Sequence, residues 1–209
     1  MMKTKKLKGF GSPENDYFFN FEKLNLIMFL RIVPIGNLPK EILDSVINEL
    51  GDLNIKCRVM SKLDVPQEAF NHWRKQYNAE IVMNMLSQSS EIKFIDRSIP
   101  SLLITEADLY YSGLNFVFGL EDPAKSCAIV SLARLKTEFY DEKPNKSLLE
   151  ERVAKEVIHN IGHYVGLDHC LHITCVMNFS PSVYDIDKKQ KTFCDNCKLD
   201  LMTRGINIG

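Results

Sequence analysis

The sequence predicts an α/β fold of α+β character, in which a mixed, twisted sheet packs against a backing helix and against a second helix that carries histidines. Three observations support this prediction. A strand–helix–strand pattern occupies residues 26–60, a long amphipathic segment at 147–166 contains closely spaced histidines, and paired cysteines follow it. A strand–helix–strand unit implies a right-handed crossover between parallel strands. The cysteine-rich end, residues 167–209, is expected to form a small C-terminal subdomain.

The composition is that of one globular domain. Of 209 residues, 45% are hydrophobic, and 26 Lys and Arg against 27 Asp and Glu give a net charge of −1. That balance gives no argument for binding nucleic acid or an anionic membrane. No stretch approaches the ~18 apolar residues that cross a bilayer, and no apolar segment follows the first lysines as in a secretory signal. We expect a cytoplasmic monomer, with residues 1–25 as an N-terminal extension, partly disordered or anchored by aromatic residues, and residues 26–209 as a single domain.

The first elements of the domain follow from apolar periodicity and from breakers. The apolar run at 26–33, which Pro34 ends, is expected to be a central strand. A helix should follow, with Asn37 as its cap and Pro39 in its first turn. It should keep an apolar helical period until Gly51 stops it.

Beyond this helix the expected elements are shorter. Residues 55–60 predict a second strand, residues 61–76 are equally compatible with a helix start and with a loop, and Trp73 is expected to pack inside the protein. Residues 77–86 keep an amphipathic helical period. Further short strands are expected at 102–105, 116–118 and 128–132, the last two joined by a turn at 121–123.

The longest predicted helix follows a charged, proline-containing loop at 137–146. Ser147-Leu148-Leu149-Glu150 has the spacing of a capping box, so the helix should begin there. It should run for ~18 residues, about 27 Å at 1.5 Å per residue, to about Gly166. An apolar stripe along it is formed by Val153, Val157, Ile161 and Val165.

Three histidines near the end of this helix have the spacing of metal ligands. His159 and His163 are four residues apart and therefore share one helix face. Gly166 adopts left-handed dihedrals without strain, so the chain can turn there and return His169 as a third ligand. Three imidazoles with one open position are typical of a catalytic zinc site. The alternative is a frayed helix end with exposed histidines.

Four cysteines form a second candidate site. Cys170 and Cys175 follow the last of these histidines, and Cys194 and Cys197 form a Cys-x-x-Cys pair. In a cytosolic protein, two close pairs of thiols favour zinc over disulfides. We prefer four thiolates to a set in which His172 replaces one of them, because each pair then comes from one tight segment. Such a zinc ion would stabilise the fold directly.

The combined pattern resembles a known family. His-Asn-x-x-His-x-x-Gly-x-x-His-Cys, followed by the cysteines and by Met177 between them, closely resembles the motif of the archaemetzincins, which are metzincin zinc metalloproteases. The resemblance extends to 105–109, 114–119 and 131–135 and spans about residues 26–200. It implies a metzincin-like fold and a zinc-dependent metallopeptidase that hydrolyses peptide bonds. It also implies two zinc ions per chain, one catalytic and one structural.

One residue departs from the family pattern at a position with a chemical role. Metzincins have a glutamate there, which acts as general base on the attacking water, whereas this chain has Asn160. A carboxamide can hold a water but cannot take its proton. The resemblance also implies that Met177 lies beneath the catalytic zinc, the alternative being an ordinary core methionine.

The resemblance raises the question of which neighbouring residues serve the site. Residues 128–134 would lie near the edge strand that binds substrate by strand addition, or form a core strand without that role. Glu156, one turn before Asn160, could reach the site through a second water, although we favour a solvated surface residue. Asp168 could orient a histidine, although we favour a surface turn.

Asn160 leaves several interpretations open. The chain is a zinc metallopeptidase with weakened or altered turnover, a catalytically silent zinc protein that binds peptides in its cleft, or a structural double-zinc module. A fourth interpretation is an ordinary enzyme inactivated by an introduced asparagine. The partner in the first two interpretations is a peptide or protein.

Overall fold

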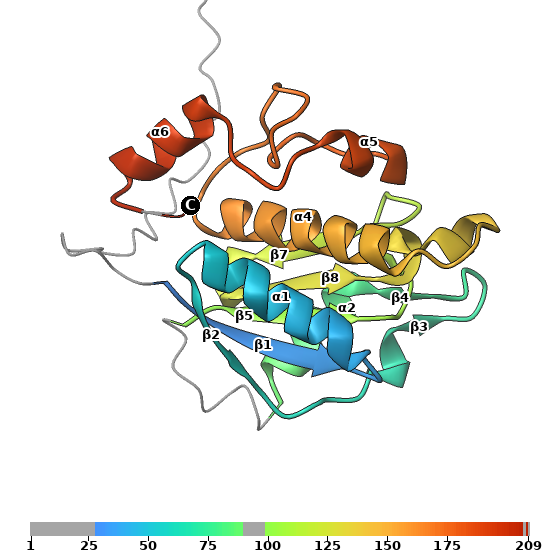
Figure 1. Ribbon diagram of the computed structural model, residues 1–209. Coiled ribbons are helices and arrows are strands. Elements are labelled where there is room, and N and C mark those ends of the chain that lie inside the picture. The colour runs from blue at the N-terminus through green and yellow to red at the C-terminus, as the bar shows by residue number, and fades with distance from the viewer. Residues whose placement is uncertain (1–27, 90–98, 207, 209) are drawn as a thin grey trace, which may run out of the picture.

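A five-stranded mixed sheet forms the centre of the computed structural model, which describes residues 28–89, 99–206 and 208 (Figure 1). The strand order is β2-β1-β5-β8-β7. All neighbouring strands are parallel except β7, which runs antiparallel to β8. The predicted extension at 1–25 lies outside the described residues. The strands are β1 Phe29–Ile35, β2 Lys56–Val59, β5 Ser101–Thr105, β7 Gly119–Asp122 and β8 Cys127–Ser131.

Helices cover both faces of this sheet. Helices α1 and α4 lie on one face and α2 on the other, while α5 and α6 lie on the outer side of α4, away from the sheet (Figure 1). A small second sheet has the order β3-β4-β6. The helices are α1 Lys40–Asp52, α2 Ala79–Ser87, α4 Lys146–Tyr164, α5 Val183–Lys188 and α6 Asp195–Thr203, and the small strands are β3 Phe70–Asn71, β4 Gln76–Asn78 and β6 Leu109–Tyr110.

Two hydrophobic clusters follow from the alternation of side chains along the strands. In β5, Leu102 and Ile104 pack in the cluster that contains α1 and α4, whereas Leu103 packs in the cluster that contains α2. The apolar stripe predicted for α4 is buried at Val153 and Val157. The predicted mixed sheet with a backing helix and a histidine-bearing helix is therefore confirmed. Among the described residues, no helix has the length and hydropathy that a membrane span requires.

The boundaries predicted around the first helix are wrong for identifiable reasons. Strand β1 continues through Pro34. Proline lacks an N–H, but at this position an N–H would face the side of β1 where β2 has already ended, so no strand hydrogen bond is lost. The Pro34 carbonyl still accepts from Leu63 N at 3.0 Å. Asn37 does not cap α1, because its Oδ1 accepts from Lys62 Nζ at 3.0 Å and Pro39 is the N-cap residue. Helix α1 also continues through Gly51.

The middle of the chain also differs from expectation. Trp73 is 98% exposed, so the prediction that it packs inside is wrong. Residues 61–76 form a short 3-10 turn and two of the small strands rather than a longer helix. The strand expected at 116–118 begins instead at Gly119, and the expected turn at 121–123 contains the end of β7. Strand β8 is buried and interior, so the prediction that 128–134 lies near the edge gives way to its core alternative, with β7 at the edge.

Helix α4 begins at Lys146, and its cap lies two residues before the predicted one at Ser147. Its N-cap is Asn145, whose Oδ1 accepts from Leu148 N at 3.1 Å, and Ser147 lies inside the first turn. At the other end Gly166 has a φ of +93° and Leu167 N donates to Gly162 O at 2.9 Å. This left-handed turn was predicted, and it redirects the chain toward His169.

Replacing Asn145 with alanine should lower the free energy of unfolding by about 1 kcal/mol, because the cap of α4 is lost. Ser147→Ala is the matched control and should change it little, since Ser147 is not the cap. Urea denaturation of both variants measures the difference. A larger loss of unfolding free energy in the Ser147 variant would instead support Ser147 as the cap.

Candidate metal centres

Helix α4 directs two histidines toward one point. His159 Nδ1 lies 2.8 Å from Val176 O, and His163 Nδ1 lies 2.8 Å from Leu167 O. A backbone carbonyl only accepts, so each Nδ1 carries the proton and each Nε2 carries a lone pair. The two Nε2 atoms face one another at 3.1 Å. Two lone pairs at that distance repel unless a cation lies between them, and two nitrogens on one tetrahedral zinc ion are about 3.3 Å apart.

His169 completes the set from the loop beyond Gly166. Its ring centroid is 4.6 Å from that of His163 and 5.3 Å from that of His159. One ligand nitrogen from each of the three residues lies within 4.8 Å of the others. His169 is exposed whereas the other two are partly buried, so the site opens on the His169 side. The predicted trio is therefore brought together.

The surroundings of His159 and His169 favour the neutral form of their rings. Burial lowers the pKa of His159 well below 6.5, and the charge of Lys189 acts in the same direction. Burial also lowers the pKa of His169, with His163 as the next cause. Neutral imidazole is the form that binds a metal, so the fold holds these two residues in a ligand-competent state.

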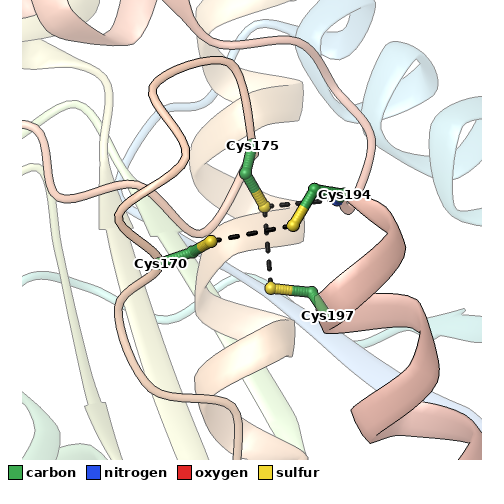
Figure 2. A group of neighbouring side chains, drawn as sticks. All are labelled: Cys170, Cys175, Cys194 and Cys197. Carbon is green, nitrogen blue, oxygen red and sulfur yellow. Dashed lines mark hydrogen bonds between the residues drawn. The ribbon is translucent and has the colours of Figure 1, made fainter.

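The four cysteines also converge (Figure 2). The Sγ atoms of Cys170 and Cys194 are 3.7 Å apart, as are those of Cys175 and Cys197. A disulfide requires about 2.05 Å, whereas two sulfurs on one tetrahedral zinc ion, each at about 2.3 Å, are about 3.8 Å apart. The spacing therefore fits a metal. His172 is outside this group, since its Nδ1 pairs with Thr174 Oγ1 at 3.1 Å.

The thiols differ in acidity. Burial opposes ionisation of Cys194, but hydrogen bonds from the Cys197 backbone and from the other thiols lower its pKa to about 7. Burial raises the pKa of Cys175 and Cys197. Only a cation at the centre would hold all four as thiolates, because metal coordination deprotonates a thiol outright.

One segment joins the two groups of ligands. Cys170 follows His169 directly, and its N–H donates to Met177 O at 2.9 Å while its carbonyl accepts from Asn178 Nδ2 at 2.8 Å. Met177 is fully buried, and its Sδ lies so close to Gly162 that an added Cβ would overlap it. Met177 therefore packs against α4 one residue before His163. We call residues 170–178 the bridging segment.

Asn160 is held against the edge of the sheet. Its side chain is buried, and Nδ2 donates to Glu156 O at 2.7 Å. A Cβ on Gly119 would lie 2.5 Å from this nitrogen, so only glycine allows β7 to approach it. Oδ1 is buried without a hydrogen-bond partner among the described residues. The amide therefore makes a contact that a carboxylate, which only accepts, cannot make.

Sequence reasoning missed one feature beside the histidines. Glu156 is buried and its Oε1 lies 3.2 Å from Lys189 Nζ, so the prediction of a solvated glutamate is wrong. The available signal was that Glu156 precedes His159 by three residues, which places both on one helix face. Asp168 is exposed and Leu167 O orients His163 instead, which confirms the surface-turn alternative.

Comparison with known proteins agrees with this geometry. The sequence matches the family model "Peptidase family M54" over residues 23–203. The archaemetzincin of Methanocaldococcus jannaschii is 39% identical over 183 residues, which cover 88% of this chain and 98% of that protein. The archaemetzincin of Saccharolobus solfataricus is 41% identical over 172 residues, which cover 81% and 91%.

Solved structures show the same relationship in the fold. A zinc-dependent peptidase from Methanocorpusculum labreanum superposes with a TM-score of 0.74 at 31% identity, covering 82% of this chain and 99% of that one. The archaemetzincin of Archaeoglobus fulgidus, crystallised with malonate, gives a TM-score of 0.69 at 31% identity, with coverage of 82% and 99%. Because sequence and fold agree over most of its length, the chain belongs to peptidase family M54, the archaemetzincin family of zinc metallopeptidases.

Proposed function

We propose that this chain is a zinc metallopeptidase that binds peptides at its three-histidine site and turns them over slowly because position 160 lacks a carboxylate. His159, His163 and His169 bind the catalytic zinc ion in this proposal. The observation that carries it is the pair of Nε2 atoms 3.1 Å apart, each bare because Nδ1 donates to a carbonyl. The partner is a peptide or protein, and the chain acts as a cytoplasmic monomer.

Zinc in this site supplies a Lewis acid that polarises a scissile carbonyl and lowers the pKa of water. The chain must then move a proton from the attacking water to the leaving amine. General acid–base catalysis of this kind contributes ~10² to 10⁴ in rate. Asn160 cannot accept that proton, and its Nδ2 is engaged by Glu156 O. What remains is the Lewis-acid chemistry of the zinc ion together with binding and orientation of the substrate, and we therefore expect slow turnover.

The edge of the sheet supports a binding mode for that substrate. Strand β7 is one of the two edge strands of the five-stranded sheet, and Gly119 at its start packs directly against Asn160. An extended peptide added to this edge would pass beside the residue at the general-base position. The substrate strand therefore belongs along β7, one strand outward from the 128–134 segment that the sequence indicated.

The second zinc ion in the proposal is structural and is bound by Cys170, Cys175, Cys194 and Cys197. Its ligands come from the bridging segment and from the start of α6. This ion would anchor the bridging segment, which delivers Val176 O to His159 and Met177 to the underside of α4. Its role is therefore in folding and in positioning the first site.

A second candidate function is a peptide-binding protein without turnover. The buried hydrogen bond from Asn160 Nδ2 to Glu156 O favours it, because a glutamate at 160 would place two acceptors together. The Asn160 Nδ2 donor thus has a hydrogen-bond acceptor within the same helix. This candidate differs from the first only in the rate of hydrolysis.

Metal analysis should find about two zinc ions per chain. His163→Ala should lower this to about one by opening the histidine site, and Cys197→Ser should lower it to about one by opening the thiolate site. Elemental analysis of the purified variants measures both losses. Wild-type content of one ion or none would contradict the double-site proposal.

Loss of the zinc ion at the cysteine site and loss of the zinc ion at the histidine site should have different effects on stability. Cys197→Ser should lower the thermal midpoint strongly, because structural zinc supplies folding free energy. His163→Ala should lower it far less, since its ring is at the open site. Calorimetry on both variants measures the shifts, and equal shifts would argue against separate structural and catalytic roles.

Asn160→Glu should raise kcat/KM for peptide hydrolysis by ~10² to 10⁴, because it restores a proton acceptor. Asn160→Gln is the matched control, with the length of glutamate but without its carboxylate, and should give no gain. Cleavage of a mixed peptide library, followed by mass spectrometry, measures the rates. An inactive Glu variant that still binds zinc would favour the peptide-binding candidate.

A further inference from the structure

We propose that Lys189 is a positioning residue of the three-histidine site. With Glu156 as its counter-ion, it holds the end of the bridging segment against α4 and so keeps Val176 O in place for His159. The inference rests on the proposed zinc-binding role of His159. It extends that role to two buried charged residues outside both groups of ligands.

The ion pair is buried and has a defined geometry. The Lys189 side chain has 0% exposure and that of Glu156 has 6%, with Nζ and Oε1 3.2 Å apart. A buried ammonium and carboxylate remain in place only when each is compensated. Lys189 Nζ also donates to Asn178 O at 3.3 Å. The lysine therefore joins the last residue of the bridging segment to a side chain of α4.

The same helix face holds the segment at a second point. His159 follows Glu156 by three residues and therefore lies on the same face of α4. Its Nδ1 donates to Val176 O at 2.8 Å, two residues before Asn178. Besides the packing of Met177 against Gly162, two polar contacts thus join the segment to α4, one directly through His159 and one through Lys189. A shift at Asn178 would move the carbonyl that fixes the tautomer and direction of the His159 ring.

The segment has other anchors. One lies at Val176 itself, whose N–H donates to Thr192 O at 3.0 Å. The cysteine group holds its start at Cys170 and Cys175, and Met177 packs into the core on the side of Gly162. Near its end, Asn178 O accepts only one further bond among the described side chains, from Ser180 Oγ at 3.4 Å. The carbonyl that accepts from His163 Nδ1 belongs to Leu167, which lies outside the segment. Loss of the lysine should therefore affect metal binding through His159 while the thiolate site stays intact.

The test separates the ion pair from the contact with Asn178. The charge swap Glu156→Lys with Lys189→Glu keeps a buried pair, but a carboxylate at 189 cannot donate to Asn178 O. The double variant Lys189→Met with Glu156→Leu removes both charges, so neither residue leaves an unpaired buried charge. It provides a second test if the charge-swap variant does not fold. Lys188→Met is the control, because Lys188 is 65% exposed and pairs with Asp185 on the surface.

Cobalt(II) titration of the full-length protein provides the readout. Thiolate-to-metal charge transfer reports the cysteine site, and d–d bands without charge transfer report the histidine site. The histidine site should bind Co²⁺ about 10- to 100-fold more weakly in both double variants, as for other outer-shell partners of metal ligands. The cysteine site, and both sites in the Lys188 control, should be unchanged.

Wild-type affinity at the histidine site in either double variant would overturn the inference and leave the proposed function standing. Equal weakening of both sites would also overturn it, because it would show a general loss of structure. Failure of the wild-type histidine site to bind Co²⁺ would instead overturn the proposed function, and this inference with it.

Discussion

The direction of two imidazole rings is the constraint on which the rest of this structure depends. His159 and His163 each donate Nδ1–H to a backbone carbonyl, from Val176 and Leu167, and this leaves both Nε2 atoms facing one point. Helix spacing alone places the two rings on one face, but it does not choose their tautomer. Backbone carbonyls choose it, because they have no proton to give.

Much of the C-terminal region serves to deliver those two carbonyls. The left-handed turn at Gly166 brings Leu167 O back to His163. The bridging segment brings Val176 O to His159, and it is held by the cysteine group at its start, by Met177 beneath α4 and by Lys189 at its end. The four-cysteine group and the buried ion pair of Lys189 and Glu156 in the same short stretch both help to fix the Val176 carbonyl beside His159.

The two groups of candidate ligands could be predicted from the sequence because the information for them is local. Spacings of four and six between histidines, a glycine at the turn and two close cysteine pairs are readable without tertiary structure. The features that failed depend on distant partners. Glu156 looked solvated because Lys189, its partner, lies 33 residues away. The start of α4 was misplaced because Ser147 has capping-box spacing, whereas the actual cap, Asn145, is held by the preceding loop, where its N–H donates to Thr137 Oγ1 at 3.1 Å.

The sheet shows the same division. Strands β1, β5 and β8 were predicted from apolar runs, because buried parallel strands are continuously apolar. The prediction misplaced strand β7 because its residues neither form an apolar run nor alternate strictly between apolar and polar. All four are partly buried, in keeping with its position at an edge of the sheet. Its position matters most for function, since Gly119 packs against Asn160. The close approach of helix and edge strand explains why glycine occupies that position.

The central claim is that both Nε2 atoms bind one zinc ion while both Nδ1 atoms stay on their carbonyls. A crystal structure of the zinc-loaded protein, with anomalous data on both sides of the zinc edge, tests it directly. The account predicts an anomalous peak at about 2.0–2.1 Å from Nε2 of His159, His163 and His169. A second peak should lie among the four sulfurs. Coordination through Nδ1, or no peak between the histidines, would contradict it.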